Sequence, residues 1–538
     1  MESHKITQIT KSVGILGLAT VISRVLGYIR DAYNAFLFGA GFVSDAFFVA
    51  YRIPNMLRDL LAEGALSSAF IPTFVEYLEK EGKGSAFRLA NIVLNLLIIL
   101  FSLIILIGII CTPVIIRIMA PGFILEGVKL TIKLTRILFP FIAFMGFSAI
   151  FMGMLNSTKH FTIPAIAPAL GNIVMILSGI FICPLFGHKP DEQIIGWTIG
   201  ALFSGLIQVI IQIPQIYKNG FRFKFIIDFK DSGIRKITKM MLPAIFSNSV
   251  SQINIVLVNT VIASILGTAA ITYLYYGFRL MQLPLGIFGV AIATASFPVI
   301  SSHVAKNEIN KLRETLSFAI RMNLFITIPA TFGLIVLSYP INSLLFQHGN
   351  FTIGDTRATA NAAICYTLGL SFASCVKVLI PTFFALNDSK TPVKIGIIAI
   401  FLNVFFSIML INPLGYKGLA LASSISSFFN FTFLFLRLRS KVGKLDEIEI
   451  LKSLAKIILA SICMAFICWL SAYIIQKNFD VNNILNKAIW VFVPMTFGLV
   501  VYVAISFLFK VKESNIFLNV MKEKLNKNIK TNKFMDND

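Results

Sequence analysis

The sequence predicts an all-α polytopic membrane protein built from two similar six-helix halves. Of its 538 residues, 57% are hydrophobic and only 13% are charged, whereas soluble domains carry about 25% charged residues. Apolar runs of about 18 or more residues recur along the chain, and each is long enough to cross a bilayer as a helix. Matching residues in the two halves indicate an internal repeat. We therefore expect fourteen transmembrane helices: two pseudo-symmetric six-helix lobes around a central cavity, and two extra C-terminal helices.

The expected N-lobe is residues 1–217. Its first apolar segment follows Lys11 directly and shows no cleavage pattern of a signal peptide, so we expect it to remain as the first span. The second span contains Pro54 and Pro72, and proline inside a helix removes a backbone donor, so we expect it to be kinked or broken. The six predicted spans are 11–39, 43–77, 87–117, 130–156, 163–186 and 194–217.

A basic connector, residues 218–239, leads to the expected C-lobe, residues 240–436. Aromatic and basic residues alternate over 221–225, and this period of two favours a short interfacial strand or hairpin. The C-lobe spans are predicted at 240–266, 270–304, 312–346, 356–386, 392–411 and 418–436. The chain then continues with a second basic connector (437–453), spans thirteen and fourteen (within 454–509) and a polar, partly disordered tail (510–538).

The distribution of basic residues predicts the orientation. Lysine and arginine crowd both connectors and the tail, whereas loops 39–42 and 267–269 hold none, so both termini are expected in the cytoplasm. The net charge of +22 has the same explanation and does not call for nucleic acid. Six cysteines without CxxC spacing and five scattered histidines predict no metal, disulfide or cofactor site.

The repeat is visible in single residues. Pro113 recurs as Pro340 and Arg52 as Arg279, both at an offset of 227 residues. Each half has an even number of spans, so the halves share one orientation and are related by an axis along the membrane normal. Two such lobes around a central cavity are typical of transporters.

Charged residues concentrate within the first two spans. Each costs about 2.5–3.5 kcal/mol at the centre of a membrane helix, so they must face a polar cavity or one another. The eight charges are Arg24, Arg30, Asp31, Asp45, Arg52, Arg58, Asp59 and Glu63. Because they sum to zero, a salt-bridged scaffold is an alternative to a polar pathway.

The C-lobe adds Arg279, Arg321 and Lys377 without an acidic residue nearby in the sequence, which makes the cavity positive. Arginine donates bidentate hydrogen bonds to phosphate and stays protonated. We therefore expect an anionic substrate shared between the lobes.

Three segments carry a resemblance to a known family. The first two helices, SRVLGYIRDAYNAF through AEGALSSAF, closely resemble those of the MurJ/MviN lipid II flippases, and YYGFRLMQLPLGIFGVA and KTPVKI resemble later segments of the same family. The family belongs to the multidrug/oligosaccharidyl-lipid/polysaccharide exporter superfamily. The resemblance implies a flippase, not an enzyme, that moves undecaprenyl-diphosphate-linked disaccharide-pentapeptide across the bacterial cytoplasmic (inner) membrane by alternating access, for peptidoglycan synthesis.

The resemblance also implies roles for single residues. Arg24, Arg58 and Arg279 would hold the diphosphate, and a groove within 454–509 would take the prenyl tail. We expect the remaining substrate-binding residues to be Ser23, Arg30 and Lys377, and the charge-pairing or gating residues to be Asp31, Asp45 and Glu63. Expected partners are lipid II, membrane lipids and enzymes of cell-wall synthesis, and the chain is expected to be a monomer.

This sequence departs from some relatives around Arg279, where Phe278 and Gln282 replace acidic residues, so Arg279 is less neutralised. Residues 248–254 contain no acidic side chain, which disfavours a sodium site there. Two other functions are alternatives to a lipid II flippase. One is a cation-coupled drug or polysaccharide exporter on the same scaffold. The other is a membrane glycosyl- or phosphotransferase, which needs a carboxylate cluster and metal ligands that the sequence does not offer.

Overall fold

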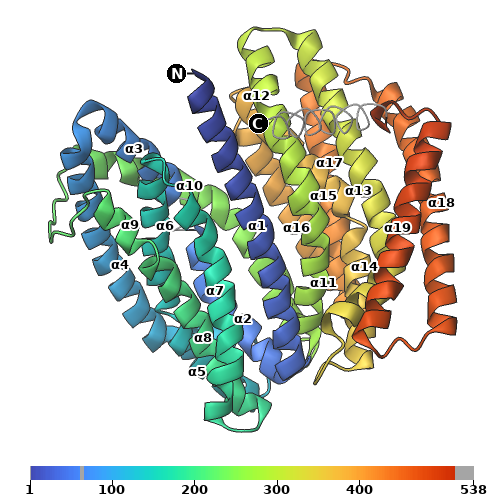
Figure 1. The fold of residues 1–538 in the computed structure, drawn as a ribbon, viewed down its shortest axis with the longest axis horizontal. Helices are drawn as coiled ribbons and strands as arrows, with labels where there is room; N and C mark the ends of the chain where they lie inside the picture. Colours follow the sequence, from blue (N-terminus) through green and yellow to red (C-terminus); the bar gives the residue numbers. More distant parts are fainter. Residues whose placement is uncertain (1, 61–65, 515–538) are drawn as a thin grey trace, which may run out of the picture. The chain divides into compact units, whose positions relative to one another are not determined.

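The fold is helical, as predicted. The computed structural model describes residues 2–60 and 66–514, and these residues contain helices and no β-strand (Figure 1). Each predicted span coincides with one helix or with consecutive helices. Within the described residues, ten helices are long and apolar enough to cross a membrane, or eleven if a pair bent by 44° is one span. The count of fourteen crossings stays a prediction, and the predicted tail beyond residue 514 lies outside the described residues.

The helices pack into two compact units, and the first comprises Met1–Tyr273 and Leu345–Asp355. In it α1 packs against α7, α2 against α5, and α10 against α3 and α4. Its helices are α1 (Glu2–Phe38), α2 (Phe42–Leu57), α3 (Ser67–Lys80), α4 (Gly82–Met119), α5 (Leu125–Leu138), α6 (Phe141–Ser157), α7 (Thr162–Phe181), α8 (Pro190–Ile210), α9 (Ile213–Lys218) and α10 (Ser232–Val256), with the short turns η2 (Cys183–Phe186) and η3 (Leu257–Ile262).

The second predicted span is not one continuous α-helix. Helix α2 ends at Leu57, one turn after Pro54, and α3 begins at Ser67. Residues 58–60 follow α2 in a π-helical conformation, and residues 61–65 lie outside the described residues. Pro54 lacks a backbone N–H, which favours such a change of helical hydrogen bonding. Arg58, the first residue after α2, keeps helical backbone dihedrals of φ −57° and ψ −52°.

Helix α10, predicted as the first helix of the C-lobe, belongs to the first unit. The Tyr77 hydroxyl of α3 lies 2.9 Å from Ser232 Oγ, and Lys236 forms an ion pair with Glu76. The units therefore divide the chain at Tyr273, whereas the lobes inferred from the repeat divide it at the connector 218–239.

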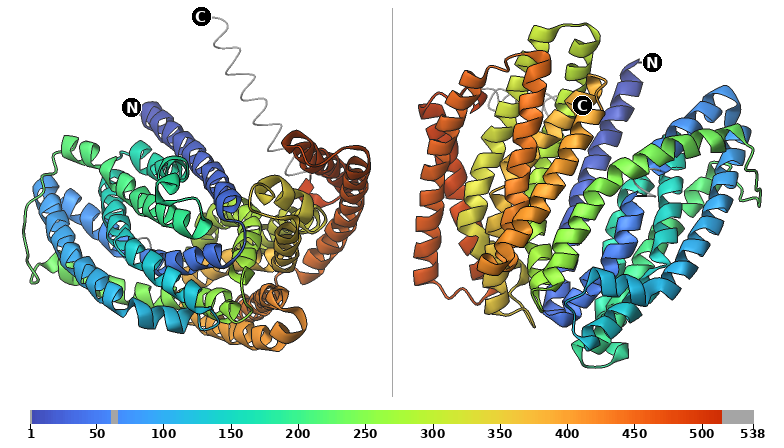
Figure 2. Two further views of the ribbon diagram at one scale, coloured as in Figure 1. Left: turned by 90° about the horizontal axis from the view of Figure 1, so that it is seen from below. Right: turned by 180° about the vertical axis from the view of Figure 1, so that it is seen from behind.

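The connector itself forms no hairpin. It runs along α4, and the side chains of Asn91 and Asn95 form hydrogen bonds with its backbone. The connector is the green segment beside α4 in Figures 1 and 2. The predicted extended conformation has a helix as its partner, not a second strand.

The second unit comprises Leu274–Leu344 and Thr356–Asp538. The apolar core joins α13, α15, α17, α18 and α19, and the Tyr502 hydroxyl of α19 donates to the carbonyl of Phe325 at 2.6 Å. Helices α18 and α19 lie side by side at one edge of this unit (Figures 1 and 2). The helices are α11 (Ala270–Pro284), whose first turn lies in the first unit, α12 (Val290–Ala305), α13 (Ile309–Phe346), α14 (Ile353–Thr367), α15 (Leu370–Ala385), α16 (Lys390–Leu414), α17 (Tyr416–Val442), α18 (Glu447–Asn478) and α19 (Ile484–Leu508), with the turn η4 (Leu285–Gly289).

Asp388, between α15 and α16, connects the start of α16 to α17. Its carboxylate accepts bonds from the Thr391 backbone at 3.0 Å and hydroxyl at 2.6 Å, and it pairs with Lys441 of α17. Losing a helix-capping bond costs about 1 kcal/mol, and an exposed ion pair about 0.2–1 kcal/mol. We expect Asp388→Ala to lower the melting temperature of the purified protein at neutral pH.

The pH dependence of this effect has a defined sign. Lys441 and Thr391 hold the pKa of Asp388 well below its usual range. The carboxylate therefore stabilises the fold above the ordinary carboxyl pKa, and the contribution is lost as pH falls through the lower folded-state value. Melting curves against pH should show the variant and the parent converging in acid. Glu314→Ala, at an exposed carboxylate of α13, is the control, and an Asp388→Ala variant as stable as the parent at neutral pH would contradict the assignment.

Candidate functional site

Arg30 and Asp31 of α1 form an ion pair, and Asn172 of α7 adds a hydrogen bond to Arg30. The Arg30 guanidinium donates to Asp31 Oδ1 at 3.0 and 2.6 Å and to Asn172 Oδ1 at 3.1 Å. Asn172 also donates to the backbone carbonyl of Ser23 at 3.1 Å. Asp31 is only 3% exposed, so its charge is offset by Arg30 inside the protein. Asn172 was not anticipated from the sequence, although a polar amide within an apolar span is the signal that marks it.

Arg24 differs from Arg30. It lies on α1 seven residues before Asp31, on the same face of an ideal helix, and its side chain is half-buried. Within the described part of its own unit, Arg24 makes no ion pair. A partly dehydrated guanidinium without a carboxylate partner is suited to an anionic ligand.

Arg58 lies at the end of α2, next to a second polar cluster. Its guanidinium donates to Asp59 Oδ1 at 3.1 and 2.7 Å, and Gln252 of α10 donates to Asp59 Oδ2 at 3.0 Å. Arg58 and Asp59 are 22% and 28% exposed, so water or a ligand reaches both. Gln252 is a second participant that the sequence did not single out. Glu63, predicted to pair nearby, lies outside the described residues.

Asp45 is completely buried and bonded at the start of α11. Its Oδ2 accepts the backbone N–H of Ala269 at 2.6 Å, and its Oδ1 accepts the backbone N–H of Thr272 at 2.8 Å and the Thr272 hydroxyl at 2.6 Å. A carboxylate at a helix N-terminus satisfies donors that have no partner within the helix. Asp45 therefore ties α2 to the first turn of α11, and its predicted pairing with an arginine stays a prediction.

Arg279 and Lys377 belong to the second unit. Arg279 is half-buried on α11, and Lys377 is exposed on α15 between the buried residues Val376 and Val378. Within the described part of this unit, Lys377 makes no ion pair. The predicted role of both cations in substrate binding stays a prediction.

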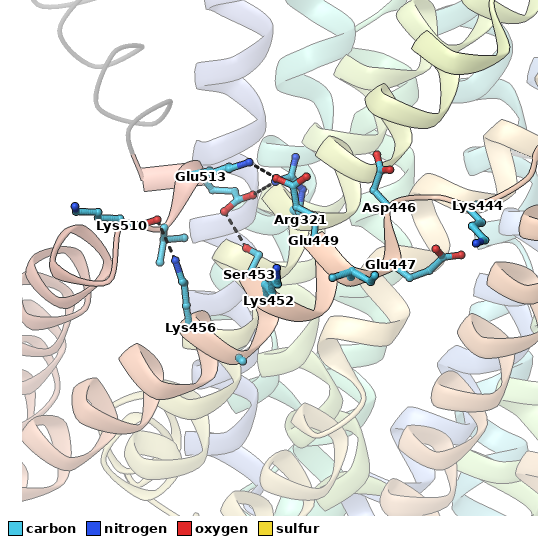
Figure 3. A pocket seen from close by; sticks show the side chains of 14 residues that line it. Arg321, Lys444, Asp446, Glu447, Glu449, Lys452, Ser453, Lys456, Lys510 and Glu513 are labelled. Carbon is cyan, nitrogen blue, oxygen red and sulfur yellow. Dashed lines mark hydrogen bonds and ion pairs between the residues drawn. The ribbon is translucent and has the colours of Figure 1, made fainter.

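Arg321, which the sequence indicated as a cation without acidic neighbours, is paired through tertiary contacts. Its Nη1 lies 3.0 Å from Glu513 Oε1 and 3.3 Å from Glu449 Oε1. Ser453 donates to the other oxygen of Glu513 at 2.9 Å, and Lys512 pairs with Glu449. Figure 3 shows these side chains converging on a cavity of about 790 Å³ beside α13 and α18. The expectation that Arg321 adds uncompensated positive charge was wrong, because its partners lie more than a hundred residues away in the sequence.

Known proteins match most of the chain. A family model described as "Lipid II flippase MurJ" matches residues 34–489. The probable lipid II flippase MurJ of Vibrio cholerae serotype O1 is 36% identical over 437 residues, which cover 80% of this chain and 82% of that protein. A protein of the same description from Buchnera aphidicola subsp. Schizaphis graminum is 31% identical over 503 residues, with coverages of 93% and 97%.

Solved structures agree with these matches. A lipid II flippase MurJ in an inward closed conformation is 30% identical, with a TM-score of 0.75, and the match covers 92% of this chain and 98% of that one. An inward-facing multidrug transporter of the MATE family is 16% identical, with a TM-score of 0.67 and coverages of 81% and 99%. The second likeness concerns the fold alone.

The environment of Asp45 leads to a prediction about stability. Asp45→Ala leaves the buried N–H groups of Ala269 and Thr272 without an acceptor, and each unsatisfied buried group costs about 1–3 kcal/mol. We expect a clearly lower melting temperature in detergent, with a smaller loss for Asp45→Asn because the amide keeps one acceptor oxygen.

Thr73→Ala is the matched control, since the buried Thr73 hydroxyl bonds only to the Ala69 carbonyl of its own helix. If Asp45→Ala melted no lower than Thr73→Ala, the carboxylate would not be the link between α2 and α11.

Proposed function

This chain belongs to the MurJ family of lipid II flippases, and we propose that it moves lipid II by holding the diphosphate of the substrate on arginine side chains. The protein is a transporter and not an enzyme, and it serves peptidoglycan synthesis. Family membership supports lipid II as the substrate. The single observation that most supports the arginine site is Arg24, half-buried on α1 without an ion pair in the described part of its unit.

The proposed substrate contacts are made by arginine side chains. Arg24, Arg58 and Arg279 bind the diphosphate, because their planar guanidinium groups match phosphate oxygens in a bidentate manner. The same site is completed by Ser23, Arg30 and Lys377. A groove within residues 454–509 receives the prenyl tail.

The acidic residues are proposed to act when the substrate is absent. Asp31 already pairs with Arg30, and Asp59 with Arg58. An arginine without a partner in a partly dehydrated site is costly, so a carboxylate that exchanges with the diphosphate lowers that cost between cycles. We assign Asp31, Asp45 and Glu63 to this charge pairing and gating.

The topology is proposed from the loops and the repeat. Both termini lie in the cytoplasm of a chain that crosses the inner membrane fourteen times. Residues 1–217 and 240–436 form two lobes that alternate access to one site. The protein works as a monomer and delivers its product to cell-wall synthesis enzymes.

Replacing the arginines tests the proposal. Arg24→Ala, Arg58→Ala and Arg279→Ala should each abolish or strongly reduce rescue of a flippase-depleted bacterium, with normal amounts of protein in the membrane. A lost hydrogen bond to a charged group costs about 1.5–3 kcal/mol, which weakens binding roughly 10–100-fold. Lysine replacements should restore activity only in part, because an ammonium loses the bidentate geometry.

Lys83→Ala, at an exposed lysine at the start of α4, controls for loss of charge as such. Full rescue by all three alanine variants would leave the salt-bridged scaffold as the better account of these arginines.

A further inference from the structure

The connector between α9 and α10 has an unusual partner. Asn91 of α4 donates to the carbonyl of Arg222 at 3.0 Å and accepts the N–H of Lys224 at 2.8 Å. Asn95 donates to the carbonyls of Lys224 at 2.8 Å and Ile226 at 3.1 Å. One helical turn rises about 5.4 Å, close to the roughly 6.6 Å spanned by two extended residues. Two amides one turn apart therefore hold an extended chain along the helix.

This geometry sorts the side chains of the connector into two faces. Even-numbered residues point their backbone groups at α4, and side chains alternate between faces along an extended chain. The odd-numbered residues Phe223, Phe225 and Ile227 form one face, which we name the apolar face; they are 47%, 73% and 41% exposed. Phe229, 70% exposed, follows in a turn. Three large apolar side chains in a row and a fourth in the adjoining turn, all exposed, do not stabilise the fold of this unit.

The backbone on the outer side of the connector limits where the apolar face can lie. Among the described residues, nothing accepts the N–H groups of Phe223 and Phe225. Backbone groups without partners are not tolerated against hydrocarbon but are satisfied by water and lipid headgroups. The connector therefore fits the boundary between headgroups and acyl chains, where aromatic side chains are enriched.

The polarity of α4 indicates the same depth. Lys83 and Arg88, before the two asparagines, are exposed, and exposed apolar side chains begin at Ile98, one turn after Asn95. The hydrogen bonds of the connector to α4 thus end at Asn95, one turn before the exposed apolar residues of α4 begin.

The charges around the apolar face favour an anionic surface. Lys218, Lys224 and Lys230 are exposed, and their ammonium groups make no ion pair with any described residue. Asp228 is neutralised by Arg88 at 3.2 Å. The Arg222 guanidinium folds back onto the carbonyl and ring of Tyr217. Lysines beside a membrane surface are attracted by anionic lipids.

We propose that residues 221–229 are an interfacial anchor that docks on the membrane leaflet facing the cytoplasm. The apolar face enters the boundary between headgroups and acyl chains. Lys224 starts from the opposite face, and its long side chain, like those of Lys218 and Lys230, places the ammonium group among headgroups of anionic phospholipids. Because Asp231 caps α10 by accepting the Gly233 N–H at 2.9 Å, the anchor fixes the start of α10 at this depth. The side of the membrane rests on the proposed topology; docking itself does not depend on the substrate.

Quenching by brominated phospholipids tests the anchor without measuring transport. Phe225→Trp, read as the difference from the parent with its three tryptophans, should lose most of its added fluorescence in vesicles brominated near the headgroup end of the acyl chains. Lys83→Trp is the matched aqueous control and should keep its fluorescence. Leu106→Trp, on the exposed middle of α4, should respond most to bromine deep in the bilayer. Retention of fluorescence by Phe225→Trp, as in Lys83→Trp, would overturn the anchor.

The lipid charge provides the second arm of the test. Phe225→Trp should be quenched more in vesicles of phosphatidylcholine with phosphatidylglycerol than in phosphatidylcholine alone. Replacing Lys218, Lys224 and Lys230 by glutamine should remove that difference while the protein elutes normally in gel filtration. Equal quenching in both lipids would overturn the role of anionic headgroups. Each result is independent of flipping, so failure of the anchor is distinguishable from failure of the flippase assignment.

Discussion

The absence of water inside the bilayer is the constraint on which this structure depends. A polar group there must find its partner within the protein, since hydrocarbon offers none. Helices satisfy the backbone, and two arginines of the first two spans bond to close neighbours: Arg30 to Asp31 and Asn172, and Arg58 to Asp59. Arg24, half-buried on the same helix as Arg30, makes no ion pair within the described part of its unit.

The structure contains features of both interpretations of the charged first two spans, the salt-bridged scaffold and the polar pathway. A scaffold of ion pairs exists, but each pair joins adjacent residues on a helix and keeps its arginine partly accessible. Such a pair offsets the guanidinium charge inside the protein while 17% of the Arg30 side chain and 22% of the Arg58 side chain stay exposed, as the proposed exchange with phosphate requires. A flippase needs both properties, because its site is empty for part of each cycle.

Much of the helical fold and the interruption of the α-helix in the second span were predictable, because apolar runs and proline act locally. The family was also accessible from short motifs of the first two helices. The partners of Asp45 and Arg321 were not, because Thr272, Glu449 and Glu513 lie far along the chain. Asn172 and Gln252 are polar residues in apolar spans, a signal too common to single them out without the packing of α7 on α1 and of α10 on α3. In the connector, the alternation of aromatic and basic residues predicted an extended chain, but the sequence did not indicate that the chain would bond to α4.

The most direct measurement is translocation of fluorescent lipid II by the purified protein in sealed liposomes, followed by access of an external reductant that bleaches the label. The account predicts that the parent exposes the inner pool of label and that Arg24→Ala, reconstituted to the same density, does so far more slowly. Equal rates for Arg24→Ala and the parent would contradict the assignment of the diphosphate to this arginine, and no translocation by the parent would contradict the flippase account itself.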